Sequence, residues 1–163
     1  MGLDIYAAAK KFYEGMVRCA LFTGTTEHED QHLDTAGYGE DNLTAEARSY
    51  LGKEAVTVCT IAISLDALNL EHSDFEQAGI DFWFARNGHG AGFSDRTDMY
   101  GNIAVTVLEK LAEGFGEAEL YEIGKGELDL VCRLYAAGQP ERKVNTPVTE
   151  SHVTINDLWE ELL

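Results

Sequence analysis

The segment FWFARNGHGAGFSDR, residues 82–96, constrains the fold more than any other part of this 163-residue chain. It contains the dipeptide Asn87-Gly88, which is a preferred sequence for a two-residue type I′ turn because both positions need a positive φ. Runs rich in aromatic residues flank the dipeptide on the N-terminal side, and glycines follow it. The segment therefore predicts a β-hairpin with arms at residues 81–86 and 89–95.

The register of this predicted hairpin separates rings from charges. Side chains alternate between the two faces of a strand, so the phenylalanines at 82, 84 and 93 share one face, suited to packing beneath helices. Arg86 and His89 lie opposite one another at the open end of that face. Trp83 lies on the other face, across the bare backbone of Gly90 and Gly92, and covering that backbone is the favoured explanation for the two glycines.

The alternative explanation is that the glycines leave main chain open to a ligand or partner. In that case arginine side chains can engage a carboxylate or phosphate, and a histidine can transfer a proton near neutral pH. The expected binding residues are Arg86, His89, Arg96, Trp83 and Asn87. The catalytic alternative uses His89, Arg86 and Asp95.

The segment lacks the other parts of common catalytic motifs. Ser94 is not in a nucleophile-elbow sequence, and the glycines do not follow the GxxxxGK[ST] pattern of a phosphate-binding loop. We therefore expect no cofactor, and an enzyme is the less favoured class.

The string HEDQH provides a weaker metal alternative with His28 and His32 as ligands. It matches the HExxH pattern, which binds zinc when both histidines project from one helical face. Here the string lies in a polar, glycine-containing stretch that predicts a long acidic loop over residues 23–42. Loop context disfavours a zinc site, because the chemistry needs ligands fixed on a helix and a third ligand elsewhere.

The rest of the chain alternates between helical and strand patterns. Apolar residues recur at steps of three and four in three stretches, which predicts helices at residues 4–21, 44–69 and 100–115, with a short helical turn at 74–77. The stretches ELYEI and ELDLVCRLY, separated by GKG, predict a second hairpin. The C-terminal extension, residues 140–163, ends in TINDLWEELL, which predicts a short terminal helix.

These elements predict a single α+β domain over residues 1–163. Its small antiparallel sheet, made of two hairpins, packs against three or four helices. Cys19, Cys59 and Cys132 are far apart and flanked by apolar residues, which favours reduced, buried thiols over disulfides. No signal peptide or apolar run of about 18 residues is present, so we expect a cytoplasmic protein without membrane contact.

The chain is strongly acidic, with 29 Asp and Glu against 12 Lys and Arg and a formal net charge of −17. Seven acids and no Lys or Arg lie between Glu27 and Glu46, and six more acids, again without a cation, lie between Glu54 and Asp81. Such a charge repels nucleic acid, so direct nucleic-acid binding is not expected. It favours solubility, and its sharper interpretation is imitation of a polyanion toward a nucleic-acid-binding partner.

The stretch DFWFARNGHGAGFSDR, residues 81–96, resembles the signature DFWxxRNGHGAGFxDR of a family of small acidic proteins of bacteriophages and bacterial mobile elements. The resemblance extends over roughly residues 18–123 and includes CALFTGTT, LDTAGY and GEAELYEI. The chain departs from the family at Ser94, where Trp is common, and at Phe84-Ala85, where Leu-Thr is more usual. We refer to residues 81–96 as the signature segment.

The resemblance implies a phage context rather than a reaction. The expected function is that of a phage-type acidic interaction protein that acts on a host protein in the host cytoplasm, as an inhibitor of a nucleic-acid-handling or defence system of the anti-restriction or anti-CRISPR type. DNA mimicry is one form of that function. A small enzyme or ligand-binding protein with its site in the signature segment remains the alternative.

Overall fold

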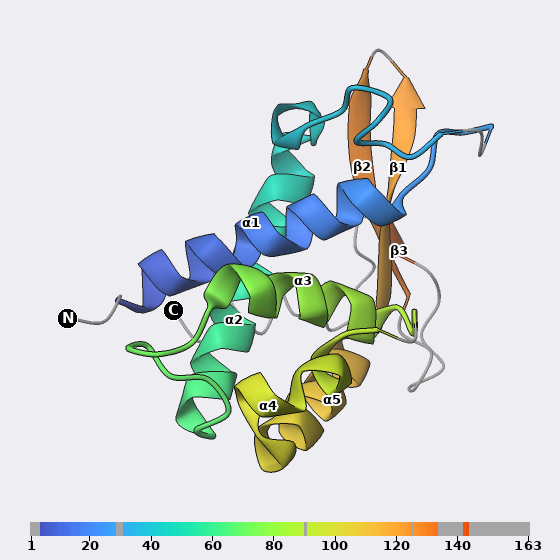
Figure 1. Ribbon diagram of the computed structural model, residues 1–163. Coiled ribbons are helices and arrows are strands. Elements are labelled where there is room, and N and C mark those ends of the chain that lie inside the picture. Colours follow the sequence, from blue (N-terminus) through green and yellow to red (C-terminus); the bar gives the residue numbers. More distant parts are fainter. Residues whose placement is uncertain (1–3, 29–30, 90, 125, 134–141, 144–163) are drawn as a thin grey trace.

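The computed structural model describes residues 4–28, 31–89, 91–124, 126–133 and 142–143 (Figure 1). The helices are α1 (Ile5–Thr23), α2 (Ala45–Ser64), α3 (Phe75–Arg86), α4 (Thr97–Tyr100) and α5 (Asn102–Phe115). The strands are β1 (Glu117–Gly124), β2 (Glu127–Arg133) and β3 (Arg142–Lys143), and short 3-10 turns cover Glu40–Asn42 and Phe93–Arg96. The predicted helix at TINDLWEELL lies outside the described residues.

The first two helices are where their periodicity predicts them. Asp4 caps α1, because its carboxylate accepts from the N–H of Ala7 at 2.7 Å. Thr44 caps α2 through its hydroxyl. The β-branched run in α2 is helical, as predicted, but α2 ends at Ser64 rather than at residue 69, because Asp66 adopts the left-handed conformation at φ 57°.

The predicted hairpin at residues 81–95 is wrong, because α3 continues through its first arm. Asp74 caps this helix by accepting from the N–H of Gln77 at 3.0 Å. The buried residues of α3 follow a helical spacing through Phe75, Ala78, Phe82 and Arg86. The aromatic run that suggested a strand is therefore the continuation of an apolar helical face that begins at Phe75.

The Asn-Gly dipeptide ends α3 instead of turning a hairpin. Gly88 adopts φ 64°, and its N–H donates to the carbonyl of Ala85 at 3.3 Å. The N–H of His89 donates to the carbonyl of Phe84 at 3.2 Å, which completes a Schellman motif. Left-handed glycine serves both structures, so the dipeptide alone did not distinguish them.

Two glycines bring α1 and α3 into direct backbone contact. A Cβ on Gly15 would lie 2.0 Å from the carbonyl oxygen of Glu76, and a Cβ on Gly79 would lie 2.0 Å from that of Phe12. No side chain fits at either position, so this pair of glycines sets how closely the helices approach. Figure 1 shows α1 and α3 side by side across the middle of the molecule, with α4 and α5 below α3.

The sheet has the order β1-β2-β3 and is antiparallel throughout. Glu117 pairs with Arg133 and Leu120 with Leu130, which confirms the second predicted hairpin. The class is therefore α+β, as predicted, with one of the two predicted hairpins present and the other replaced by α3. The three cysteines are buried and free, as predicted.

Candidate functional site

Arg86 of the signature segment is buried inside the protein and does not lie at a rim. Its guanidinium forms a bidentate ion pair with Glu54 of α2, and neither side chain is exposed (0% each). Its Nε donates to the carbonyl oxygen of Gly116 at 2.8 Å, and its Nη2 donates to that of Phe115 at 3.2 Å. Arg86 thus joins α2, α3 and the C-terminal end of α5.

The surroundings of this ion pair explain its electrostatics. Burial raises the pKa of Glu54, and the neighbouring guanidinium opposes that shift. Burial alone lowers the pKa of Arg86, but the Glu54 carboxylate more than compensates, so the pKa of Arg86 is raised. The rings of Phe82 and Trp83 lie 5.3 and 5.4 Å from the guanidinium carbon, which is cation–π geometry.

The two ends of the signature segment are joined by a second buried carboxylate. Asp81 is 1% exposed and accepts from Arg96 Nε at 3.1 Å, from the Tyr100 hydroxyl at 2.7 Å and from Gln77 Nε2 at 3.1 Å. Burial and the hydrogen bond to Asp81 raise the pKa of Tyr100. This carboxylate therefore holds the turn Phe93–Arg96 and α4 against α3.

Gly92 lies where the returning chain touches α3. Its φ is 132°, and a Cβ at this position would lie 2.9 Å from the carbonyl oxygen of Asp81. The carboxylate of Asp95 accepts from the Gly92 N–H at 3.1 Å. The glycine therefore permits close packing of backbone on helix, and it does not lie beneath Trp83 as the hairpin predicted.

Asn87 and His89 occupy the boundary between α3 and the sheet. The Asn87 amide donates to the carbonyl of Trp83 at 2.9 Å and accepts from the N–H of Ala118 in β1 at 2.8 Å. His89 is exposed, and its ring lies edge-on to Phe84 at 5.9 Å. Trp83 itself is 1% exposed.

The residues predicted to form one site thus do not act on a common point, because each charged side chain is bound to a different partner within the protein. Arg86 pairs with Glu54, Arg96 with Asp81, and Asp95 with the backbone of its own turn. Only part of the set shares a hollow, of about 170 Å³, which is lined by Ala20, Thr23, Gly24, Thr25, Trp83, Asn87, His89 and residues 117–119. A binding role for this part of the chain stays a prediction.

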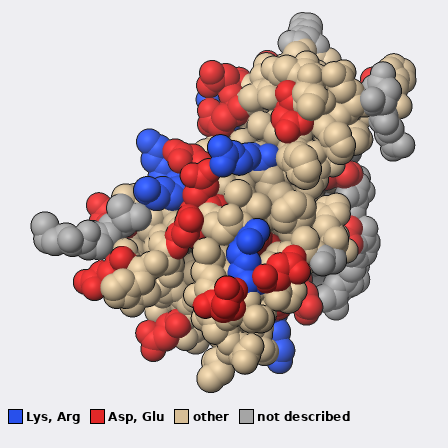
Figure 2. Space-filling view, viewed as in Figure 1, with Lys and Arg blue, Asp and Glu red and all other residues tan. Residues whose placement is uncertain are grey.

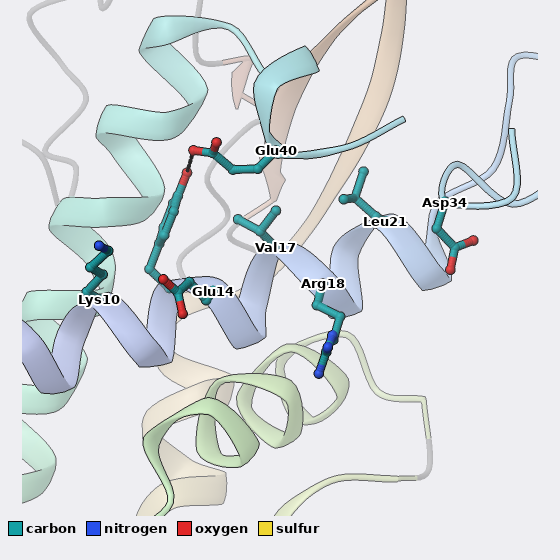
Figure 3. A pocket seen from close by; sticks show the side chains of 8 residues that line it. Lys10, Glu14, Val17, Arg18, Leu21, Asp34 and Glu40 are labelled. Carbon is teal, nitrogen blue, oxygen red and sulfur yellow. Dashed lines mark hydrogen bonds between the residues drawn. The ribbon is translucent and has the colours of Figure 1, made fainter. Parts of the chain in front are cut away.

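A hollow of about 640 Å³ over α1 was not predicted from the sequence (Figure 3). Val17 and Leu21 form its apolar floor, and the Tyr13 hydroxyl donates to Glu40 at 2.8 Å along one wall. Its remaining lining residues are charged: Lys10, Glu14, Arg18 and Asp34. The apolar residues on the outer face of α1 were a signal for this hollow, but the return of the acidic loop over that face was not visible in the sequence.

The charges of this hollow are partly engaged elsewhere. Figure 3 shows Arg18 directed toward α3, where it pairs with Glu76 at 2.6 Å. Burial, followed by the hydrogen bond to Glu40, raises the pKa of Tyr13. The hollow therefore presents an apolar floor between carboxylates of both α1 and the acidic loop.

His28 and His32, the ligands of the weaker metal alternative, lie on a loop, as the polar sequence around them predicted. The ring of His32 stacks on that of Phe22 with centroids 5.7 Å apart, and His28 is exposed. Within the described residues, no group of three side chains is arranged to hold a metal ion.

Comparisons with known proteins place this chain in no family. No protein-family model matches it, and no curated protein and no solved structure matches it. Among the described residues, none of the helices is long and apolar enough to span a membrane.

Proposed function

We propose that the protein is an acidic interaction protein that binds a host protein and inhibits nucleic-acid handling or defence. The observation that carries this proposal is where the negative charge lies. Glu54, Asp81 and Asp129 are the buried carboxylates of the described residues, and the other described acids reach the surface. Among the described residues, most acidic side chains are thus directed outward, in a chain whose formal net charge is −17.

This charge selects the class of partner. An acidic surface repels DNA, RNA and anionic membranes at long range and attracts proteins with basic surfaces. Proteins that handle nucleic acid carry such basic surfaces, because they bind phosphates. The resemblance of the signature segment to phage and mobile-element proteins supports a partner in a restriction or CRISPR system.

The arrangement of acids bears on how the binding would work. On the face drawn in Figure 2, acidic side chains are spread over the surface and interleaved with Lys and Arg. No unbroken row of acidic side chains is visible on that face. We therefore propose charge attraction to a basic partner as the general mechanism and imitation of DNA as its narrower form.

The alternative, a ligand or catalytic site in the signature segment, has less support. It needs Arg86 and Arg96 to be available for an anionic ligand, but each is engaged by a buried carboxylate of the protein. His89 keeps an exposed ring beside a small hollow, so a test of this alternative reduces to a single variant, His89→Ala.

The experiment for the proposed function is capture of a partner from host lysate at low and high salt, followed by elution with duplex DNA. We expect a basic nucleic-acid-handling protein that is retained at low salt and released both by salt and by the competing duplex. Absence of any salt-sensitive partner, or a partner that duplex DNA does not displace, contradicts inhibition through a nucleic-acid-binding surface.

A further inference from the structure

One side of α1 carries a stripe of side chains that lines two hollows. Tyr6, Lys10, Tyr13, Val17 and Leu21 follow one another at steps of three and four, so they share one face of the helix. Lys10 and Tyr13 line both the hollow of about 640 Å³ and a second one of about 280 Å³ toward the N-terminal end of α1. Because the hollows share these residues, they form one continuous surface. We refer to the stripe and its two hollows as the α1 face.

Charge is divided between the two ends of the α1 face. The hollow at the N-terminal end is lined by two cations, Lys10 and Arg48, and by no carboxylate among the described residues. The larger hollow brings together three carboxylates, those of Glu14, Glu40 and Asp34. Figure 3 shows Lys10 and Asp34 at opposite ends of this larger hollow. One end of the α1 face is therefore positive and the other is negative.

The charges at both ends are accessible to a second molecule. Lys10, Arg48 and Glu14 are exposed, and within the described part of the chain none of them forms an ion pair. Arg18 is the remaining cation of the larger hollow, and its charge is compensated by Glu76 of α3 at 2.6 Å. The positive end and the negative end are therefore not neutralised by each other within one molecule.

Charges that neighbour the α1 face in sequence largely strengthen this division. Lys11 and Lys53 add positive charge beside the N-terminal end, and Asp41 adds negative charge at the other end. Two acids near the positive end have the opposite sign. Asp4 is engaged as the cap of α1, and Glu46 in the first turn of α2 lines neither hollow.

A surface with opposite charges at its two ends is complementary to itself after a half-turn. A two-fold axis through the middle of α1 places the positive end of one copy on the negative end of another, and it does so twice. We propose that the α1 face is a dimer interface in which α1 of a second copy lies antiparallel to α1 of the first.

The positions of the side chains along α1 fix the register of this dimer. Lys10 of each copy pairs with Glu14 of the other. Because the helices run in opposite directions, Tyr6 of each copy then lies beside Val17 of the other. Tyr6 is 64% exposed, and the larger hollow, with Val17 and Leu21 as its floor, has room for its ring. Each copy thus contributes one exposed ring and one hollow that receives a ring.

Charge complementarity selects a second copy over two other occupants. A uniformly basic segment of a partner protein meets cations at the N-terminal end of the face. The chain's own residues 144–163 contain four acids and no Lys or Arg, so they meet carboxylates at the other end. Only an occupant with both signs of charge, placed in the opposite order, is attracted at both ends.

The net charge of −17 opposes association of two copies, but cations are concentrated beside the α1 face. Five of the 12 Lys and Arg lie in α1 and the first half of α2, where the exposed acids are Glu14 and Glu46. On the side drawn in Figure 2, Lys and Arg side chains gather over α1. Salt at about 0.15 M screens charges more than about 8 Å apart, so the repulsion between distant acids is weakened more than the contacts within the interface.

Sedimentation equilibrium of the full chain at about 0.15 M salt tests this inference. We expect a reversible dimer with twice the 18.0 kDa mass of one chain. Tyr6→Ser should weaken the dimer at least about tenfold, because it removes the ring that fills the hollow. The matched control Ile103→Ser removes an apolar side chain of α5 that is 85% exposed, and it should leave the dimer unchanged.

A pair of charge variants tests the antiparallel register. Lys10→Glu and Glu14→Lys each place like charges opposite one another when two identical copies meet, so each variant alone should dimerise at least about tenfold more weakly. In an equimolar mixture, the new carboxylate at position 10 of one variant faces the new ammonium at position 14 of the other, and the second contact is the wild-type pair. The mixture should therefore form a heterodimer, which also shows that both variants fold.

The outcomes that overturn the proposal are distinct from those that concern the proposed function. A mass that stays at 18.0 kDa as the concentration is raised overturns the dimer, and it leaves partner capture by the acidic surface unaffected. A dimer that Tyr6→Ser does not weaken has its interface elsewhere, which also overturns the proposal. Charge variants that are weakened alone and do not associate when mixed overturn the antiparallel register.

Discussion

Replacing Glu54 by leucine removes the counter-charge of Arg86 and leaves the guanidinium buried. Arg86 keeps its hydrogen bonds to the carbonyls of Phe115 and Gly116, but it loses both carboxylate contacts in a site without solvent. Breaking a buried ion pair by removing one partner costs about 3–5 kcal/mol. For a chain of this length, that predicts a fall in Tm of roughly 6–20 °C.

Urea unfolding followed by tryptophan fluorescence measures this cost. Trp83 is a suitable reporter because it is buried and its ring lies 5.4 Å from the Arg86 guanidinium. Glu113→Leu, at an exposed position of α5, is the control, and we expect it to change the free energy of unfolding by no more than about 0.5 kcal/mol. A cost below about 1 kcal/mol for Glu54→Leu would refute a buried, mutually dependent ion pair.

The reciprocal variant, Arg86→Met, leaves Glu54 buried without its partner, and the stability of this variant should depend on pH in a way that the stability of Glu54→Leu does not. Arginine cannot lose its proton in a protein, but a carboxyl can take one up. Burial already raises the pKa of Glu54, and removing Arg86 removes the opposing effect. A folded-state pKa above the unfolded one gives stability that is present at low pH and is lost as the pH rises through the folded-state value.

Arg86→Met should therefore regain stability as the pH is lowered from 8 toward 5, whereas Glu54→Leu should show no such recovery. The double variant Glu54→Leu/Arg86→Met should be less destabilised than the sum of the single changes, because neither charge is left alone. Additive losses, or matching pH profiles for the two single variants, contradict the coupling of these side chains.

The remaining predictions concern packing, the end of α3 and the thiols. Gly79→Ala should destabilise the protein by about 1–3 kcal/mol in thermal unfolding, because the added Cβ clashes with the backbone of α1. In the control Gly114→Ala the added Cβ contacts no other atom, so this change should be neutral or stabilising. Gly88→Ala should cost about 1–2 kcal/mol because of its left-handed backbone. Burial raises the pKa of Cys19 and of Cys59 to about 12, so both should resist a thiol reagent at pH 8 until urea unfolds the protein.

Local patterns predicted the elements whose signals were unambiguous. The periodicity of α1, α2 and α5 predicted these helices, apart from the C-terminal end of α2, and the turn between ELYEI and ELDLVCRLY predicted the observed hairpin. The Asn-Gly dipeptide did not, because a left-handed glycine ends a helix as readily as it turns a hairpin. The apolar residues Phe75, Ala78 and Phe82 recur at steps of three and four, and this spacing favours a helix over a strand for residues 75–86.

The contacts of the signature segment were beyond reach of local patterns, because they join residues far apart in the chain. Arg86 and Glu54 are 32 positions apart. One clue was present: Glu54 lies on the apolar face of α2, beside Leu51, Ala55 and Val58, where a carboxylate needs a partner. The sequence does not say which cation supplies it, so the role of Arg86 required the fold.

We propose that the signature segment holds the fold together and that the acidic surface binds the partner. The affinity for the captured partner, measured as a function of salt for the wild type and for His89→Ala, tests this division of roles. We expect an affinity that falls steeply with salt and is the same for both proteins. Affinity that is independent of salt and lost in His89→Ala would contradict it and place the binding site in the signature segment.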